Sequence, residues 1–369
     1  MQTGKKRFWL GVAALVVLGY VLYRSRDLLH LSNFSGSKLW ASLRTANPLY
    51  ILLGVVIIYG CFALRALRWR VFQKNLGKAD FWPTYGLTLA GFAAIVALSR
   101  VGEFVRPLLL SRRSKVPVAD MFGIYVLERL FDFVCIAVIA SLGLLLYIPH
   151  EPVGAYSSAI QKGARTGGAL LAAGVIGVVG FLTYLRFHGT GVTERRLEGW
   201  HGQHGWRGSV ARIILGFVRG IQTIRSWRDL VQALLISALH WYLIALVYFL
   251  VAHSFQGKLA SLSVIDCLLV QSISLVGSVL QLPAVGGGPQ AMTFVAYTQV
   301  FGVESEAATA AALLLYLVTF ASCTIAGLPL LIREGFSFGQ LREMAEHEKE
   351  ELKHEAERGI THDDRGGEA

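Results

Sequence analysis

Long, nearly uninterrupted apolar segments constrain this sequence more than any other feature. Nine of them recur along the chain with charged residues mostly at their flanks, namely 8–23, 49–64, 81–98, 119–148, 168–185, 229–252, 263–282, 290–303 and 306–332. Only 16% of the residues are charged, against roughly 25% in a soluble globular chain. Continuous apolar segments of this length partition into lipid. The sequence therefore predicts an all-α polytopic membrane protein.

Two of these segments are followed by residues that break a helix. Segment 81–98 runs into the sequence Ser-Arg-Val-Gly-Glu, and segment 263–282 runs into a turn that contains Pro283, Gly286, Gly287 and Gly288. Non-helical backbone inside a membrane is tolerated only where protein or water satisfies its amides, so such breaks usually line a pathway. We expect two re-entrant helical hairpins. The alternative is a tight loop between two full spans at each break.

The distribution of basic residues predicts the topology. Beside the two hairpins, about six full spans remain, and they place both termini in the cytoplasm. The predicted cytoplasmic segments then hold 27 Lys and Arg residues and the predicted external segments hold seven, as the positive-inside rule requires. Span, hairpin and span are thereby repeated in inverted orientation, as in many transporters. Segment 8–23 lacks a cleavage motif before Arg24, so we expect an uncleaved first span in a bacterial-type plasma (inner) membrane.

The domain organisation follows from these segments. Residues 1–332 are expected to form one transmembrane domain, and 333–369 a charged cytoplasmic tail. Segment 209–227 has apolar residues on one helical face with Arg212 and Arg219 opposite, which predicts a helix lying in the cytoplasmic interface. A helix that packs on a partner protein is the alternative.

Arginines beside the helix breaks are candidates for holding a phosphate, because the planar guanidinium donates two parallel hydrogen bonds. Arg65 and Arg68 share a helix face, Arg100 lies in the first break, and Arg106 comes directly after it. Glu103 is three residues before Arg106, so we expect it to orient that guanidinium from the same face. For Arg65 and Arg68, the alternative is a basic anchor after a span. For Glu103 and Arg106, the alternative is a purely structural ion pair.

Two carboxylates interrupt the apolar segment 119–148. Glu128 and Asp132 are four residues apart and share a helix face, where they repel one another. Arg129, another arginine, a cation or a proton on one carboxyl group must relieve this repulsion. A metal site is a weaker alternative, because no histidine or third carboxylate lies nearby in the sequence.

Other polar residues inside the apolar segments have simpler interpretations. His240 is expected to be a hydrogen-bonded core histidine, with a proton relay as the alternative. The cysteines show no metal-ligand spacing and are expected to be small buried apolar residues, namely Cys61, Cys135, Cys267 and Cys323.

The motifs lie in a fixed order: Arg65-x-x-Arg68-Trp69, Gly91-Phe92, Arg100-x-Gly102-Glu103-x-x-Arg106, Glu128-Arg129-x-x-Asp132 and Leu282-Pro283-x-x-Gly286-Gly287. In them the chain resembles the flippase-like transmembrane domain family related to the membrane half of lysylphosphatidylglycerol synthases. The resemblance extends to about residue 332 and implies a lipid-translocating or lipid-handling domain. Leu98 stands where the family commonly has proline, and Pro289-Gln290 where it often has an acidic residue. The aminoacyl-transferase reaction is not implied, since only a short charged tail follows the membrane region.

Together these features predict a flippase or transporter that handles an anionic phospholipid or a polyprenyl-linked lipid. A membrane-embedded transferase that uses Glu103, Glu128 or Asp132 as general base is the first alternative. A non-catalytic subunit of a lipid- or glycan-synthesis complex is the second. We expect no metal or other cofactor, no nucleic-acid partner, and a transporter rather than an enzyme.

Overall fold

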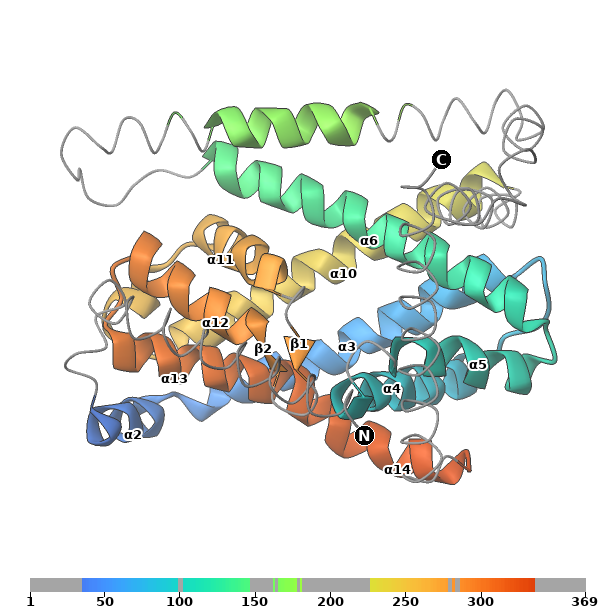
Figure 1. Cartoon of the computed structure of the whole chain (residues 1–369), viewed down its shortest axis with the longest axis horizontal. Helices are drawn as coiled ribbons and strands as arrows, with labels where there is room; N and C mark the ends of the chain where they lie inside the picture. Colours follow the sequence, from blue (N-terminus) through green and yellow to red (C-terminus); the bar gives the residue numbers. More distant parts are fainter. Residues whose placement is uncertain are drawn as a thin grey trace, which may run out of the picture.

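The computed structural model describes residues 35–98, 102–146, 162, 165–177, 180, 226–277, 281–282 and 286–335. This part of the chain is almost entirely helical (Figure 1). Its helices and strands are α2 (Gly36–Thr45), α3 (Pro48–Gln73), α4 (Phe81–Leu98), α5 (Gly102–Ser114), α6 (Val118–Leu146), α10 (Trp227–His253), η3 (Gly257–Ser261), α11 (Val264–Gly277), β1 (Gln281–Leu282), β2 (Gly286–Gly287), α12 (Gly288–Val295), η5 (Ala296–Val300), α13 (Ser305–Tyr316), η6 (Leu317–Ala321) and α14 (Ser322–Arg333).

Within the described ranges, four helices are long and apolar enough to cross a membrane: Pro48–Gln73, Asp120–Leu146, Trp227–His253 and Ser305–Arg333. The last of them joins α13 and α14 through the π-helical turn η6. These four correspond to four of the expected full spans, and the protein is an integral membrane protein. Of the other two expected spans, 8–23 lies outside the described residues and 168–185 is described only in part.

Local sequence signals set the starts of two of these helices. The Asn47 side chain accepts a hydrogen bond from the Leu49 backbone N–H at 3.0 Å, and Pro48 occupies the first turn of α3, where its missing N–H is harmless. The Ser226 hydroxyl accepts from the Arg228 backbone N–H at 3.2 Å at the start of α10. Side-chain caps therefore fix where both helices begin.

After each of the two shorter apolar helices, α4 and α11, the chain folds back into a second helix. A glycine lies at the contact between the two helices in both cases. A Cβ atom on Gly102 would overlap the Ala94 carbonyl group, so α5 packs backbone to backbone on α4. A Cβ atom on Gly277 would likewise overlap the carbonyl group of Gly288, at the start of α12. In both segments the chain therefore folds back so that two helices pack side by side.

The second turn differs from the expected continuous helix over 263–282. α11 is described to Gly277, and Gln281–Leu282 then pairs antiparallel with Gly286–Gly287 as two very short strands. Leu282 precedes a proline, which disfavours helical backbone at that position. Gly287 has a φ of 89°, a conformation that glycine adopts without strain.

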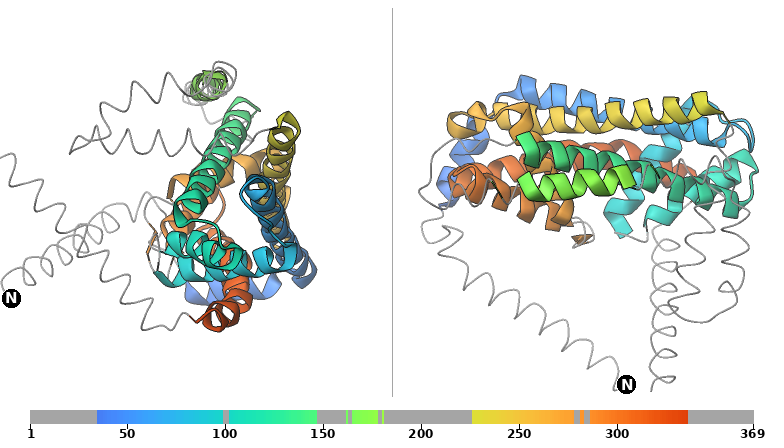
Figure 2. Two further views of the ribbon diagram at one scale, coloured as in Figure 1. Left: turned by 90° about the vertical axis from the view of Figure 1, so that its right-hand side faces the viewer. Right: turned by 90° about the horizontal axis from the view of Figure 1, so that it is seen from above.

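Helices distant in sequence pack in three main pairs. α3 lies along α10, α4 packs on α14, and α6 packs on α11. Figure 2 shows the long helices running roughly along the longest axis of the molecule. Two clusters of buried apolar side chains fill the interior, one built mainly on α3, α10, α11 and α13, the other mainly on α3, α4, α5 and α6.

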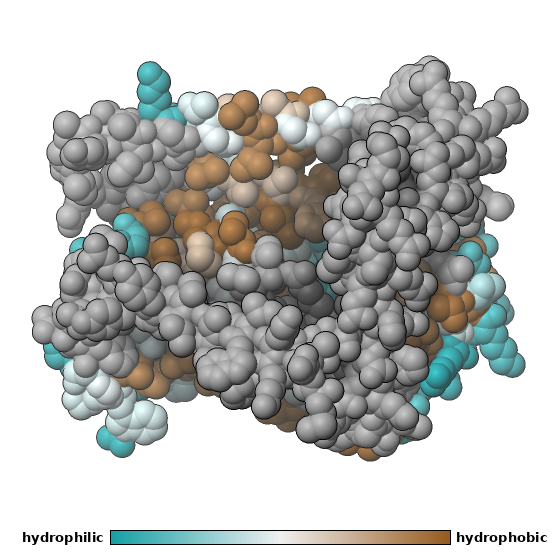
Figure 3. Space-filling model, in the orientation of Figure 1, coloured by the Kyte–Doolittle hydropathy of each residue, from teal (hydrophilic) through white to brown (hydrophobic). Residues whose placement is uncertain are grey.

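Large apolar side chains also cover the outside of the spanning helices. Examples are Leu52 on α3, Phe133 on α6, Leu235 on α10 and Ile325 on α14, each at least 60% exposed. Figure 3 shows apolar residues gathered on the face of the molecule turned to the viewer. Acyl chains provide the apolar environment that such a surface requires.

Candidate functional site

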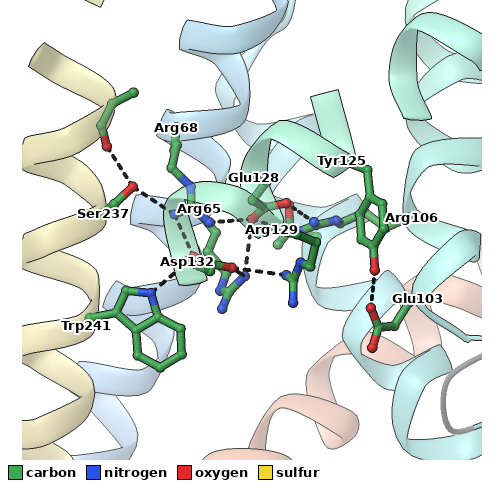
Figure 4. Close-up of polar contacts among 12 residues, drawn as sticks. Arg65, Arg68, Glu103, Arg106, Tyr125, Glu128, Arg129, Asp132, Ser237 and Trp241 are labelled. Carbon is green, nitrogen blue, oxygen red and sulfur yellow. Dashed lines mark hydrogen bonds and ion pairs between the residues drawn. The ribbon is translucent and has the colours of Figure 1, made fainter. Parts of the chain in front are cut away.

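A network of buried charged side chains lies where α3, α5, α6 and α10 meet (Figure 4). Arg68 of α3 is at its centre. One terminal nitrogen donates to Asp132 Oδ1 and to Ser237 Oγ, both at 2.8 Å, and the other donates to Glu128 Oε1 at 2.7 Å. Arg68 and Glu128 are each 1% exposed, so these contacts are shielded from solvent.

Three further arginines surround the same two carboxylates. Arg65 Nη1 lies 3.2 Å from Glu128 Oε1 and 3.5 Å from Asp132 Oδ2. Arg106 donates from both terminal nitrogens to Glu128. Arg129, whose side chain is 32% exposed, is 3.3 Å from Asp132. The repulsion expected between the two carboxylates is thus relieved by arginines.

Helical spacing explains why these side chains converge. Arg65 and Arg68 are three residues apart on α3, and Glu128 and Asp132 are four apart on α6, so each pair presents one face to the other helix. Trp241 of α10 also belongs to the network, because its indole N–H donates to Asp132 at 3.1 Å.

Aromatic rings and a glycine position the arginines. The Arg106 guanidinium lies 4.7 Å from the centroid of the Trp69 ring, and the Arg65 guanidinium lies 5.1 Å from that of Phe92, both within cation–π range. A Cβ atom on Gly91 would come within 2.5 Å of Arg106 Cβ. Gly91 therefore provides the room in which Arg106 reaches the network.

Glu103 does not orient Arg106, contrary to the expectation from their spacing. The Tyr125 hydroxyl donates to Glu103, whereas Arg106 is held by Glu128. Tyr125 and Glu128 are three residues apart on α6. Glu103 and Arg106 of α5 therefore bind different residues of the facing helix. The carboxylate that holds Arg106 therefore comes from another helix.

Positive charge exceeds negative charge at this site. Among the described residues, four arginines contact the two carboxylates Glu128 and Asp132, and Glu103 on Tyr125 adds one more negative charge. Several buried N–H groups also have no hydrogen-bond partner in the described part of the chain, namely Arg68 Nε, Arg129 Nε and Trp69 Nε1. Unpartnered donors and surplus positive charge are the features of an anion site.

Not all predicted site residues belong to this network. Arg100 and Pro283 lie outside the described residues. Gly286, Gly287 and Gly288 form the turn between α11 and α12 in the second hairpin. They belong to the second hairpin, whereas the arginines of the network lie on α3, α5 and α6.

Three members of the site were not predicted from the sequence, and the prediction for His240 was wrong. These members are Ser237, Trp241 and Tyr125, each of which forms a hydrogen bond with a charged residue. Polar atoms at positions 237 and 241, four residues apart in an apolar segment, were the sequence signal that could have predicted the contribution of α10. His240, expected to be hydrogen-bonded, is 3% exposed, and neither ring nitrogen has a partner among the described residues. The four cysteines are free and buried, as expected.

Comparison with known proteins identifies the family. No solved structure matches the chain. A UPF0104 membrane protein of Methanothermobacter thermautotrophicus is 27% identical over 142 residues, which cover 37% of this chain and 41% of that protein, so less than half of the relative is matched. The model of the lysylphosphatidylglycerol synthase TM region matches residues 8–327, which include the whole arginine network. The chain therefore belongs to the lysylphosphatidylglycerol synthase TM region family.

Proposed function

We propose that this protein moves a lipid with an anionic headgroup across the membrane and that the arginine network holds the headgroup phosphate. One observation carries the proposal: a buried site with four arginines, fewer carboxylates and unpartnered N–H donors. Uncompensated charge away from water is costly, and a bound phosphate supplies the missing negative charge together with hydrogen-bond acceptors.

The carboxylates have a positioning role in this proposal. Glu128 bonds to Arg65, Arg68 and Arg106, so it holds guanidinium groups from two helices in one place before any ligand arrives. Pre-positioned donors lose little conformational entropy on binding. Arg129 is the most exposed of the four arginines and is the natural first contact for an entering headgroup.

We further propose that the units α3 to α6 and α10 to α14 are inverted repeats. The packing pattern supports this: exchanging the units leaves the α3–α10 pair unchanged and converts the α4–α14 pair into the α11–α6 pair. In such transporters the substrate lies between the repeats, and one repeat moves against the other. The hairpins are then re-entrant, the termini are cytoplasmic and the membrane is the bacterial-type plasma membrane.

The second glycine turn has a role in the same scheme. Gly286 to Gly288 lack side chains, so their backbone amides can approach a ligand closely. Arg100, between α4 and α5 in sequence, adds a further guanidinium beside the first break. A lipid- or glycan-synthesis enzyme that consumes or supplies the lipid is the expected partner.

Reconstitution into liposomes tests the proposal. Fluorescent phosphatidylglycerol, added to one leaflet, should become accessible from the other leaflet faster than fluorescent phosphatidylcholine, with its mass unchanged. An altered lipid mass would instead indicate a transferase. If both lipids cross at the rate of protein-free liposomes and keep their mass, the transport proposal is wrong and a non-catalytic subunit is favoured.

A further inference from the structure

A second buried polar cluster lies where α11 meets α12, and it contains no charged side chain. The Tyr248 hydroxyl of α10 donates to Ser274 Oγ of α11 at 3.0 Å. Thr293 Oγ1 of α12 lies 2.9 Å from Ser274 Oγ and 2.8 Å from the carbonyl oxygen of Pro289, to which Ser274 also donates at 3.1 Å. Three helices thus direct oxygen atoms to one place beside the turn of the second hairpin.

Two more buried polar side chains, one on α11 and one on η5, have no hydrogen-bond partner among the described residues. Gln271 is 1% exposed and Tyr297 is fully buried, and neither the amide of Gln271 nor the hydroxyl of Tyr297 has a hydrogen-bond partner in the described ranges. Cys267, Gln271 and Ser274 share one face of α11, because they are spaced four and three residues apart. Cys267, Tyr248 and Tyr297 belong to one cluster of buried side chains. We therefore assign the unpartnered amide and phenol to the same cluster.

The chemistry of the cluster selects its occupant. Hydroxyl, amide and carbonyl oxygens dominate, and the Gln271 amide supplies the nitrogen, whereas the arginine network consists mainly of N–H donors. Oxygen ligands suit hard cations, and divalent ions are normally held by carboxylates, which this cluster lacks. The five side chains that form it are at most 8% exposed, which favours a small occupant over a lipid headgroup.

We propose that the cluster of Tyr248, Gln271, Ser274, Thr293 and Tyr297, with the Pro289 carbonyl, binds a monovalent alkali cation. Backbone carbonyl groups at broken membrane helices are a recurrent source of ligands for such ions. A bound cation accounts for the unpartnered Gln271 and Tyr297 oxygens, because leaving buried polar atoms unsatisfied is costly. The site is separate from the arginine network and does not depend on the proposed lipid transport.

Thermal unfolding of the purified full chain in detergent tests the proposal. A ligand that binds the folded state raises its stability in a saturable manner. The melting temperature should therefore be higher in NaCl or KCl than in choline chloride at equal ionic strength, and the increase should saturate with salt concentration. Equal melting temperatures in all three salts would mean that the cluster holds ordered water only, and would overturn the proposal while leaving lipid transport untouched.

Gln271→Leu separates binding from folding. Leucine has a similar volume and removes an unpartnered buried amide, so the variant should be at least as stable as wild type in choline chloride and should lose most of the cation response. Thr88→Val is the matched control, because Thr88 is also 1% exposed and its hydroxyl donates to the Thr84 carbonyl within one helix. It should keep the response. A wild-type response in Gln271→Leu would exclude this cluster as the cation site.

Thr293→Val provides an independent variant that keeps the side-chain shape. It removes one proposed oxygen ligand, so the salt concentration that gives half of the melting-temperature increase should rise roughly tenfold, the ratio that corresponds to a loss of about 1.4 kcal/mol. An unchanged half-maximal concentration would contradict the assignment of Thr293 as a ligand and with it the proposed ligand set.

Discussion

Arg68 is 1% exposed, and its terminal nitrogens donate to three acceptors, Asp132, Glu128 and Ser237. Each of the two carboxylates contacts several arginines. The loss of one carboxylate therefore leaves more than one arginine without that ion-pair partner. Breaking a buried ion pair from one side leaves an uncompensated charge in a low-dielectric environment, which is more costly than the pair was favourable. The network is therefore sensitive to each single member.

Asp132→Ala should destabilise the protein by about 3–5 kcal/mol, because Arg65, Arg68 and Arg129 all lose a partner. The midpoint of denaturation in detergent measures this change. Glu103→Gln is the control: glutamine keeps a carbonyl oxygen that can accept from Tyr125, so the variant should unfold near the wild-type midpoint. Equal stability of Asp132→Ala and wild type would show that the network does not stabilise the fold.

Arg106→Lys should reduce transport of fluorescent phosphatidylglycerol at least tenfold while leaving expression near wild type. Lysine keeps the charge but loses the planar pair of donors and the stacking on Trp69; a loss of about 1.4 kcal/mol corresponds to that factor. Arg113→Lys, at an exposed position of the same helix, should transport at the wild-type rate. Transport by Arg106→Lys at the wild-type rate would remove Arg106 from the proposed headgroup site.

At the scale of elements, both hairpins depend on close contact between two helix backbones. Gly102 meets Ala94 in the first hairpin, and Gly277 meets Gly288 in the second. A side chain at either position meets backbone rather than a flexible side-chain end, so relaxation requires the helices to separate. Glycine therefore permits the close approach of the two helix backbones beside each break.

Gly277→Ala should lower the free energy of unfolding by about 1–3 kcal/mol, since its Cβ atom would overlap the Gly288 carbonyl group. Gly60→Ala on α3 is the matched control. A Cβ atom there meets nothing within 4 Å, and alanine favours a helix by up to about 1 kcal/mol relative to glycine. Denaturation of both variants in detergent gives the comparison. If Gly277→Ala is as stable as Gly60→Ala, the two helices do not pack as closely as described.

At the scale of the whole molecule, three long-range pairs hold the helices together: α3 with α10, α4 with α14 and α6 with α11. Each joins the first unit to the second, so neither hairpin packs only within its own unit. Motion of one unit relative to the other would therefore have to rearrange these packed helix pairs.

Topology is tested by cysteine labelling at two exposed lysines, Lys78 after α3 and Lys258 in η3. The native cysteines are buried, which keeps their background low. In inside-out vesicles, an impermeant maleimide should label Lys78→Cys and not Lys258→Cys, and in right-side-out vesicles the reverse. Labelling of both positions from one side would contradict the proposed inverted repeats.

The sequence by itself determined the membrane class, the breaks at the two hairpins and the faces that carry charge. These depend on local properties, namely segment hydropathy, glycine and proline positions, and spacings of three and four residues such as Arg65 with Arg68 and Glu128 with Asp132. Only the tertiary structure decided which charges meet. Arg106 binds Glu128 rather than Glu103, and Ser237 and Trp241 join from α10. Such pairings depend on how helices far apart in the chain cross one another, and helical periodicity within a single segment carries no information about that crossing.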